Sequence, residues 1–374
     1  MCYQLFGNML VKEVIDAIET FAPPVYQESY DNCGLQVGKN DDEVTGILIS
    51  LDVTESVLDE ALERRCNMIV SHHPLIFSGL KKIIGRNYVE KIVQKAIKND
   101  VNIYAAHTNL DNMYGGVNAK IADKLGLGDT RILSAKTDTL SKLYTYAPLN
   151  SVEKVRDALF AAGAGNISKY KECSFNTNGT GTFRAHEDAN PAIGQAGGNR
   201  EWVDEVKIEM IVAKHTEKAV LRALFQSHPY EEVAYELIPV PNPNQQIGAG
   251  MIGKLPSPMD EPDFIAFLKK QMKTDCIRHT AFKSKKIGQV AVCGGSGSFL
   301  LKDAIAAGAD IFITGDFKYH QFFDAEGKIV IADIGHYESE QFTSEIFEEL
   351  LNKKFPTFAI LLSNINTNPV KYFF

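Results

Sequence analysis

The side chains of this chain that could do chemistry are histidines and carboxylates that follow apolar runs. Ser71-His72-His73-Pro74 comes directly after the apolar run 67–70. Neutral imidazoles suit zinc, iron, nickel or copper better than magnesium or calcium. A His-His pair on its own is more often part of an ordinary turn than a metal site. Its interpretation therefore depends on what the rest of the chain places beside it.

Two other segments repeat this pattern. Asp111 lies close behind the apolar run 101–106, and His336 and Glu340 follow the run 329–334. His336 and Glu340 are four residues apart at the predicted start of a helix, so both side chains lie on one helix face and can grip one metal ion. For such a pair alone, a solvent-exposed polar first turn is the commoner structure.

Together, the three segments provide more ligands than one metal ion needs. The ligands are His72, His73, Asp111, His336 and Glu340. A tetrahedral zinc ion takes four ligands, whereas two ions bridged by a carboxylate or by water would use all five. Such centres activate the bridging water for hydrolysis. We therefore predict a dinuclear metal centre.

The elements that must position these residues alternate between strands and helices. Apolar runs predict strands at 45–52, 67–70, 101–106, 286–293, 311–314, 329–334 and 358–362. Helical spacing predicts helices at 9–21, 88–98, 117–125, 262–272 and from 335 to about 351. This alternation is typical of parallel α/β sheets that are buried on both faces. Open sheets of this kind bind ligands at the carboxyl ends of their strands, where all three segments lie.

The pattern changes between residues 139 and 245. In order, we predict a strand at 142–148, a helix capped by Ser151, a Gly/Asn-rich region with the hairpin signal Asn178-Gly179, a strand at 206–212, a helix at 218–225 and a strand at 234–240. This is the order of a ferredoxin-like unit. The predicted fold class is α/β. A two-part α/β core domain with central sheets (residues 1–138 and 246–374) is interrupted by an inserted α+β ferredoxin-like domain (139–245).

Composition limits the classes of function. The 374 residues suffice for two or three domains. The formal charge is -8 with no dense Lys/Arg block, which argues against a nucleic-acid groove. The six cysteines include no CxxC pair, as expected in a reducing cytoplasm. No apolar run reaches the ~20 residues that span a bilayer. We expect a cytoplasmic protein that binds neither membranes nor nucleic acid.

Four motifs in this order carry a family resemblance. Ser-His-His-Pro, His-Thr-Asn-Leu-Asp, Gly-Asp-Phe-Lys-Tyr-His and Gly-His-x-x-x-Glu resemble those of the GTP cyclohydrolase I type 2 homologues, also called the Ngg-interacting-factor-like family. The resemblance covers the whole chain, including Tyr30–Gly38 and Thr367–Tyr372. It implies that the five residues above are the metal ligands, with Asp111 or Glu340 bridging. It also implies two divalent ions per chain, a CutA-like inserted domain and a toroidal homohexamer with metal sites facing its interior. Zinc is the first expectation for the metal, with iron, manganese or nickel as alternatives.

Other residues are candidates for roles besides metal ligation. His107 and His320 could transfer protons or orient a ligand, and each could equally be a structural histidine. The loop Gly295-Ser296-Gly297 lies between a strand and a helix, so its N–H groups could receive a phosphate, with Lys318 as a further phosphate candidate. A plain tight turn is the commoner structure here, because the loop is not a full GxGxxG or Walker sequence.

Two classes of function fit this ligand set. One is a metal-dependent hydrolase acting on a nucleotide-like or phosphorylated small molecule. The other is a non-enzymatic metal-binding or regulatory scaffold, whose inserted domain drives assembly or senses a ligand. Turnover that is abolished by Glu340→Ala would favour the enzyme, and a fully metallated but inert protein would favour the scaffold.

Overall fold

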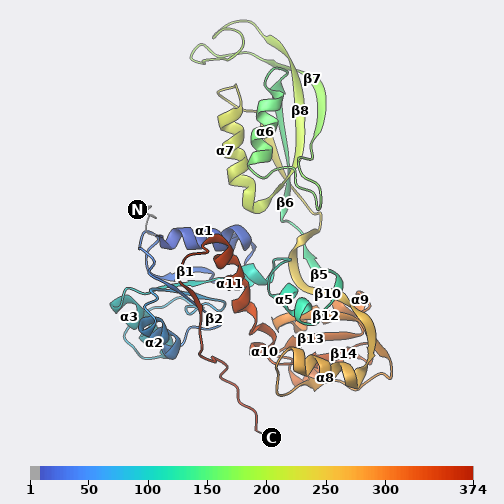
Figure 1. Cartoon of the computed structure of the whole chain (residues 1–374). Coiled ribbons are helices and arrows are strands. Elements are labelled where there is room, and N and C mark those ends of the chain that lie inside the picture. The colour runs from blue at the N-terminus through green and yellow to red at the C-terminus, as the bar shows by residue number, and fades with distance from the viewer. Residues whose placement is uncertain (1–8, 374) are drawn as a thin grey trace, which may run out of the picture. The chain divides into compact units, whose positions relative to one another are not determined.

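The computed structural model describes residues 9–373 and divides them between two units (Figure 1). One unit contains the described residues through Ser134 and those from Ile247 onward. The other contains Ala135–Gln246. The sequence prediction had put these boundaries at residues 139 and 245.

The first unit contains a five-stranded sheet with the strand order β1-β4-β3-β2-β15. Its strands are β1 (Gly34–Val37), β2 (Ile47–Ser50), β3 (Met68–Ser71), β4 (Asn102–Ala105) and β15 (Ile360–Leu362). All pairs are parallel except that of β1 with β4. Every residue of β2, β3 and β4 is buried, as the continuous apolar runs predicted. The C-terminal strand β15 thus completes a sheet that is otherwise built from the first third of the chain.

Helices cover both faces of this sheet. The apolar sides of α2 (Glu55–Glu63) and α3 (Tyr88–Lys98) pack on one face, and α1 (Val11–Phe21) and α11 (Thr343–Lys354) pack on the other (Figure 1). Thr54 begins α2, and its hydroxyl accepts a hydrogen bond from the Val57 N–H group. This side chain satisfies one of the free donors at the start of the helix.

The same unit contains a second, six-stranded sheet with the strand order β11-β14-β13-β12-β10-β5. Its strands are β5 (Gly128–Lys136), β10 (Asn244–Asp260), β11 (Arg278–His279), β12 (Lys286–Ser296), β13 (Ile311–Gly315) and β14 (Val330–Asp333). Its helices are α5 (Val117–Lys124), α8 (Glu261–Gln271) and α9 (Leu301–Ala306).

The connections of both sheets contain short helical segments. These are η1 (Pro24–Tyr26), α4 (Thr108–Asp111), η3 (Ser298–Leu300), η4 (Tyr319–Ala325) and α10 (His336–Glu340).

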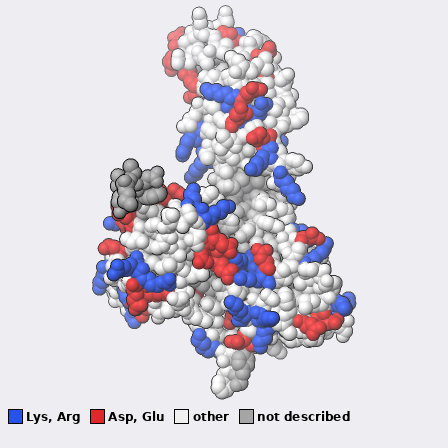
Figure 2. Space-filling model, viewed as in Figure 1, with Lys and Arg blue, Asp and Glu red and all other residues white. Residues whose placement is uncertain are grey.

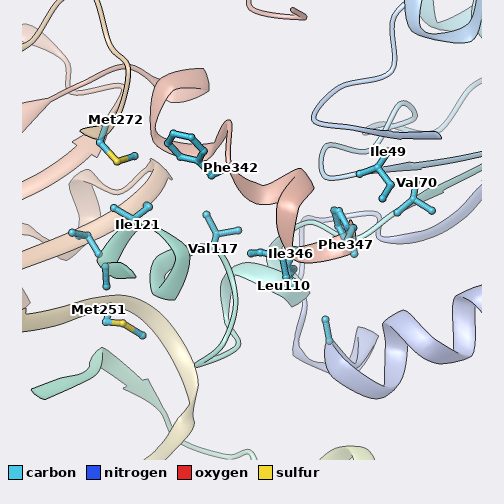
Figure 3. Close-up of a cluster of buried hydrophobic side chains, with 14 of the residues drawn as sticks. Ile49, Val70, Leu110, Val117, Ile121, Met251, Met272, Phe342, Ile346 and Phe347 are labelled. Carbon is cyan, nitrogen blue, oxygen red and sulfur yellow. The ribbon is translucent and has the colours of Figure 1, made fainter. Parts of the chain in front are cut away.

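A single buried apolar cluster joins the two sheets of this unit. Ile49 and Val70 belong to the first sheet and Met251 to the second, while Ile346 and Phe347 of α11 lie between them (Figure 3). Burying each such side chain contributes roughly 1.5–3 kcal/mol. This packing holds the strand ends of both sheets in one rigid frame, which a site built from both sheets requires.

The second unit has the predicted ferredoxin-like topology. The elements β6 (Leu140–Pro148), α6 (Val152–Ala161), β7 (Phe175–Phe183), β8 (Glu201–Ala213), η2 (Lys214–Thr216), α7 (Glu217–Ser227) and β9 (Tyr235–Val240) follow in order. The strand order is β7-β8-β6-β9, with antiparallel neighbours. Its two long helices bury Val155, Leu159, Val220 and Leu224 against the sheet.

Three local predictions were wrong. Asn178-Gly179 forms no hairpin turn, because both residues pair with β8 inside the long strand β7. Ser151 begins α6 but makes no capping hydrogen bond through its side chain. The single helix expected from residue 335 is two helices, α10 and α11, separated by Gln341 and Phe342. At Asn178-Gly179 pairing with β8 outweighed the local turn signal, and the Ser151 hydroxyl hydrogen-bonds with Asn150 Oδ1 in place of a helix N–H.

Two features of the described residues bear on partners. Positive and negative side chains are interspersed on the face shown in Figure 2, and none of its areas is uniformly basic. Among residues 9–373, no helix is both long enough and apolar enough to cross a bilayer.

Candidate metal centre

Neighbouring strands of the first sheet bring the histidines together. Ser71 at the end of β3 pairs with Ala105 at the end of the parallel strand β4, so the chain leaves the sheet at the same level after each strand. His72 and His73 follow β3, and His107 follows β4 with α4 directly behind it. Because these histidines lie beyond the ends of the strands, their rings are free of the alternation that would turn neighbours to opposite faces.

The second sheet contributes the remaining side chains through β14. The chain leaves β14 at Asp333, turns at Gly335 and enters α10, which begins with His336 and ends with Glu340. Gly335 has a φ of 94°, and a Cβ there would lie 2.2 Å from Glu338 Oε2. The turn therefore requires glycine. It aims the first turn of α10 at the strand ends of the other sheet.

Glu340 is the centre of the resulting cluster. Its Oε2 atom lies 3.0 Å from His73 Nε2 and 3.1 Å from His336 Nε2. Its Oε1 atom lies 3.8 Å from His72 Nε2, which is itself 3.5 Å from Asp111 Oδ1. The two oxygens of one buried carboxylate thus face different groups of ligands.

The structure therefore brings all five predicted ligands together in two overlapping groups. One group is His73, His336 and Glu340, and the other is His72, Asp111 and Glu340. Within each group, the ligand atoms lie within 4.8 Å of one another. His107 joins His72 and His73 in a third group at the same spacing. These histidine and carboxylate clusters can hold metal ions.

The Nδ1 atom of each histidine in the cluster forms a hydrogen bond with another part of the protein. His72 Nδ1 donates to the Ala106 carbonyl oxygen at 3.0 Å, and His73 Nδ1 donates to Asp52 Oδ1 at 2.7 Å. His336 Nδ1 is 2.6 Å from Asp316 Oδ2, and His107 Nδ1 is 2.9 Å from Asp31 Oδ1. Such partners fix the ring orientation and leave Nε2 for a metal or a proton.

The charges of the cluster perturb its titration. Burial alone would lower the pKa of His73, but hydrogen bonds with Asp52 and Glu340 outweigh burial and raise it to about 10. In the same way, Asp316 and Glu340 raise the pKa of His336 to about 11. Burial works to raise the pKa of Glu340, yet its histidine partners hold it well below the usual range. In the absence of metal, protonated His73 and His336 therefore supply positive charge that stabilises the Glu340 carboxylate.

Two buried atoms in the part of the cluster that the structure describes lack hydrogen-bond partners, whose place a cation could take. Among the described residues, His72 Nε2 and Asp111 Oδ1 are buried and have no hydrogen-bond partner. A buried polar atom without a partner costs about 1–3 kcal/mol. Both atoms face the Glu340 side of the cluster, where a metal ion would satisfy them. The donor set therefore fits a divalent ion.

The predicted glycine loop has a different structure and role, because Gly295 and Ser296 are the last residues of β12 and only Gly297 lies beyond it. The N–H groups of Gly295 and Gly297 donate to Ser339 Oγ and Thr314 Oγ1, so they are already used inside the protein. A Cβ on Gly295 would lie 2.4 Å from Glu340 Oε1. The loop makes room for Glu340, and these two N–H groups are not free to bind a phosphate.

The remaining predicted residues lie elsewhere. His320 is exposed and its ring contacts are with Tyr319 and Phe323. It lines neither of the cavities that adjoin the cluster, and Lys318 does not line them either. The structure thus gives His320 and Lys318 no place in the site.

Sequence reasoning missed the carboxylates that hold the histidine rings. Asp52 is the last residue of the predicted strand 45–52 and lies two residues beyond β2, and Asp316 directly follows β13, so both occupy strand ends like the ligands themselves. That position was the available signal. Asp31, which holds His107 and accepts from the Thr108 hydroxyl, comes from a loop and carried no such signal. Thr367 near the C-terminus was also missed, and its hydroxyl donates to Asp52 Oδ2.

These features define a class of protein in which two α/β sheets in one unit share a histidine–carboxylate cluster that can bind metal. A model of the family Duf34/NIF3 (NGG1p interacting factor 3) matches residues 9–369. The chain belongs to this family.

Relatives agree with this assignment over nearly the full chain. Proteins named "GTP cyclohydrolase 1 type 2 homolog" from Bacillus subtilis and Halalkalibacterium halodurans are 38% and 40% identical to it. Each alignment covers 96% of this chain and 98% of the relative. The crystal structure of a Bacillus cereus protein related to NIF3 aligns with a TM-score of 0.85 at 37% identity, covering 98% of this chain and 100% of that one.

Proposed function

We propose that this protein is a dinuclear metal-dependent hydrolase that acts on a nucleotide-like or phosphorylated small molecule. The observation that carries the proposal is the position of Glu340, whose two carboxylate oxygens face different histidines. Catalytic two-metal sites hold their ions close together, and one oxygen of Glu340 could bind each ion. With His73 and His336 on one side and His72 and Asp111 on the other, each ion would have three protein ligands. That number leaves coordination positions open, as in catalytic sites.

Two bound divalent ions would supply Lewis acidity and make water a better nucleophile at neutral pH. The protein's part is to hold the ligands rigidly. Asp52, Asp316 and the Ala106 carbonyl fix three imidazole rings in one tautomer. Glu340 is buried, which keeps bulk water from competing for its two oxygens.

We assign proton transfer to His107. Asp31 holds its Nδ1, which leaves Nε2 as the ring nitrogen for proton transfer. One of its ring nitrogens lies within 4.8 Å of those of His72 and His73. His107 also lines a cavity of about 770 Å³ together with Asp111, His336 and Glu340. A substrate in this cavity would lie within reach of both the ligand cluster and His107, as general acid–base catalysis requires.

Zinc is our proposal for the metal. Imidazole-rich sites favour zinc over magnesium or calcium, whereas carboxylates also admit iron, manganese or nickel. We also propose a cytoplasmic location, because the described cysteines, Cys33, Cys66, Cys173, Cys276 and Cys293, are all free thiols. A toroidal homohexamer is proposed on family resemblance, and light scattering of the intact chain tests it. A monomer in solution would refute the ring.

The test of function combines metal analysis with a broad hydrolase screen on one preparation. We expect two ions per chain and turnover in the wild type, and loss of both in Glu340→Ala. Glu345→Gln is the matched control, because Glu345 pairs with Lys120 and Lys124 away from the cluster and should behave as wild type. A fully metallated wild type that hydrolyses nothing would support the scaffold function instead. A stoichiometry of one ion would contradict the dinuclear centre.

A further inference from the structure

Exposed aromatic side chains gather at the cavity beside the ligand cluster. Tyr30, Phe77 and Phe299 are 66%, 50% and 67% exposed, and all three line this cavity. Large aromatic side chains usually bury most of their area. Three of them left open around one cavity therefore indicate a surface that a ligand covers.

The arrangement of these rings suits a flat ligand. The Tyr30 and Phe77 rings are 6.4 Å apart between centroids with planes inclined at 43°, and the Phe77 ring is 6.4 Å from the His107 ring. The same cavity is lined by His73, which belongs to the ligand cluster. A planar group that rests on Tyr30 or Phe77 would therefore share this cavity with the ligand cluster.

The charge of the cavity selects against polyanions. Among the described residues, no Lys or Arg lines it. Phosphate groups are normally held by Arg, Lys or free backbone N–H groups, and the N–H groups of Gly295 and Gly297 are already used. The six carboxylates in and behind the cavity outnumber the five positive charges of two divalent ions and Arg278, which lies near Asp316. These carboxylates are Glu28, Asp31, Asp52, Asp111, Asp316 and Glu340.

We propose that this cavity binds a nucleobase or a similar heteroaromatic ring, stacked on Tyr30 and Phe77, from a ligand that carries at most one phosphate. This inference rests on the proposed function, since it names the class of substrate for the same site. It narrows that function to nucleosides, nucleoside monophosphates and compounds of similar charge. A nucleoside triphosphate would bring charge that only the metal ions could neutralise.

Equilibrium binding to zinc-loaded protein, dialysed free of excess metal, tests the proposal. The probes are adenosine, AMP, ATP and ribose 5-phosphate. We expect adenosine and AMP to bind, ribose 5-phosphate to bind at least tenfold more weakly than AMP, and ATP to bind no more tightly than AMP. Base–aromatic stacking contributes about 1–3 kcal/mol per base. Tyr30→Leu and Phe77→Leu should therefore each weaken adenosine binding by roughly 5- to 150-fold without changing metal content.

The matched control is Phe323→Leu. Phe323 is 65% exposed and belongs to the same unit, but it does not line this cavity, so its variant should bind adenosine as wild type. Three results would each overturn the proposal: ribose 5-phosphate binding as tightly as AMP, ATP binding most tightly, or Leu variants that bind adenosine normally. Because binding is measured without turnover, a protein that binds adenosine but hydrolyses no substrate would refute the hydrolase function and leave the stacking site standing.

Discussion

Replacing Asp52 by asparagine removes a negative charge that is hydrogen-bonded to His73, a member of the ligand cluster. Asp52 Oδ1 lies 2.7 Å from His73 Nδ1, and Asp52 Oδ2 accepts a hydrogen bond from Thr367. Neither Asp52 nor Thr367 is in the predicted ligand set. Asp52→Asn should therefore act mainly through the ring of His73, its hydrogen-bond partner, which belongs to the ligand group of His336 and Glu340.

Partners of this kind typically change metal affinity by 10- to 100-fold, which is about 1.4–2.7 kcal/mol. Asp52 also stabilises a proton on His73, so its loss weakens the competing proton as well. A divalent ion carries twice the charge of a proton, so weaker metal binding should be the net result. We expect one ion to bind about 10- to 100-fold more weakly, while the ion at His72 and Asp111 is held as before.

Titration of the metal-free protein with zinc against a chromogenic chelator resolves the two affinities. Asp316→Asn should weaken the same ion through His336, and Thr367→Val should have a smaller effect in the same direction. The matched control is Asp41→Asn. Asp41 is an exposed carboxylate that pairs with Lys12 and lines neither cavity beside the cluster. If Asp52→Asn bound both ions with wild-type affinity, or lost both equally, the assignment of ligands to two groups would be refuted.

Three other predictions concern protons, space and the inserted unit. Because partner carboxylates raise the pKa of His73 to about 10 and of His336 to about 11, and ligation needs neutral rings, metal binding should release protons and tighten as pH rises from 6 to 9. Calorimetry in buffers of different ionisation enthalpy would show this, and binding without proton release would contradict it. Gly295→Ala should abolish metal binding, because its Cβ would lie 2.4 Å from Glu340 Oε1. Gly327→Ala is the control, because Gly327 has a similar φ but open space around it, and it should cost only roughly 1–2 kcal/mol of stability. Equal metal content in the two variants, measured together with thermal unfolding, would refute the role of Gly295. Removing residues 139–245 and joining the ends with a short linker spares β5 and most of β10 and should leave metal content unchanged. A folded deletion variant without metal would show that the inserted unit shapes the site.

Much of the fold was predictable because local patterns and tertiary structure agree there. The strands before His72 and His107 are continuous apolar runs, and such runs become buried parallel strands. The order of elements between residues 140 and 240 predicted the ferredoxin-like topology for the same reason. The prediction failed at Asn178-Gly179, where pairing with β8 along nine residues of β7 outweighs the turn preference of two.

The types of the candidate ligands and their positions at strand ends were predictable without a structure, because apolar periodicity is a local property of the chain. The sequence could not determine that β15 joins the first sheet or that β5 joins the second, since strand pairing depends on contacts between residues far apart. Only the tertiary structure showed that α10 faces the ends of β3 and β4, which sets Glu340 between His73 and His72. It also revealed Asp52 and Asp316 as partners of the rings, because hydrogen bonds across 20 or more residues leave no periodic signal. The residue types decide which chemistry the site can perform, and the packing of the two sheets around one core decides its geometry.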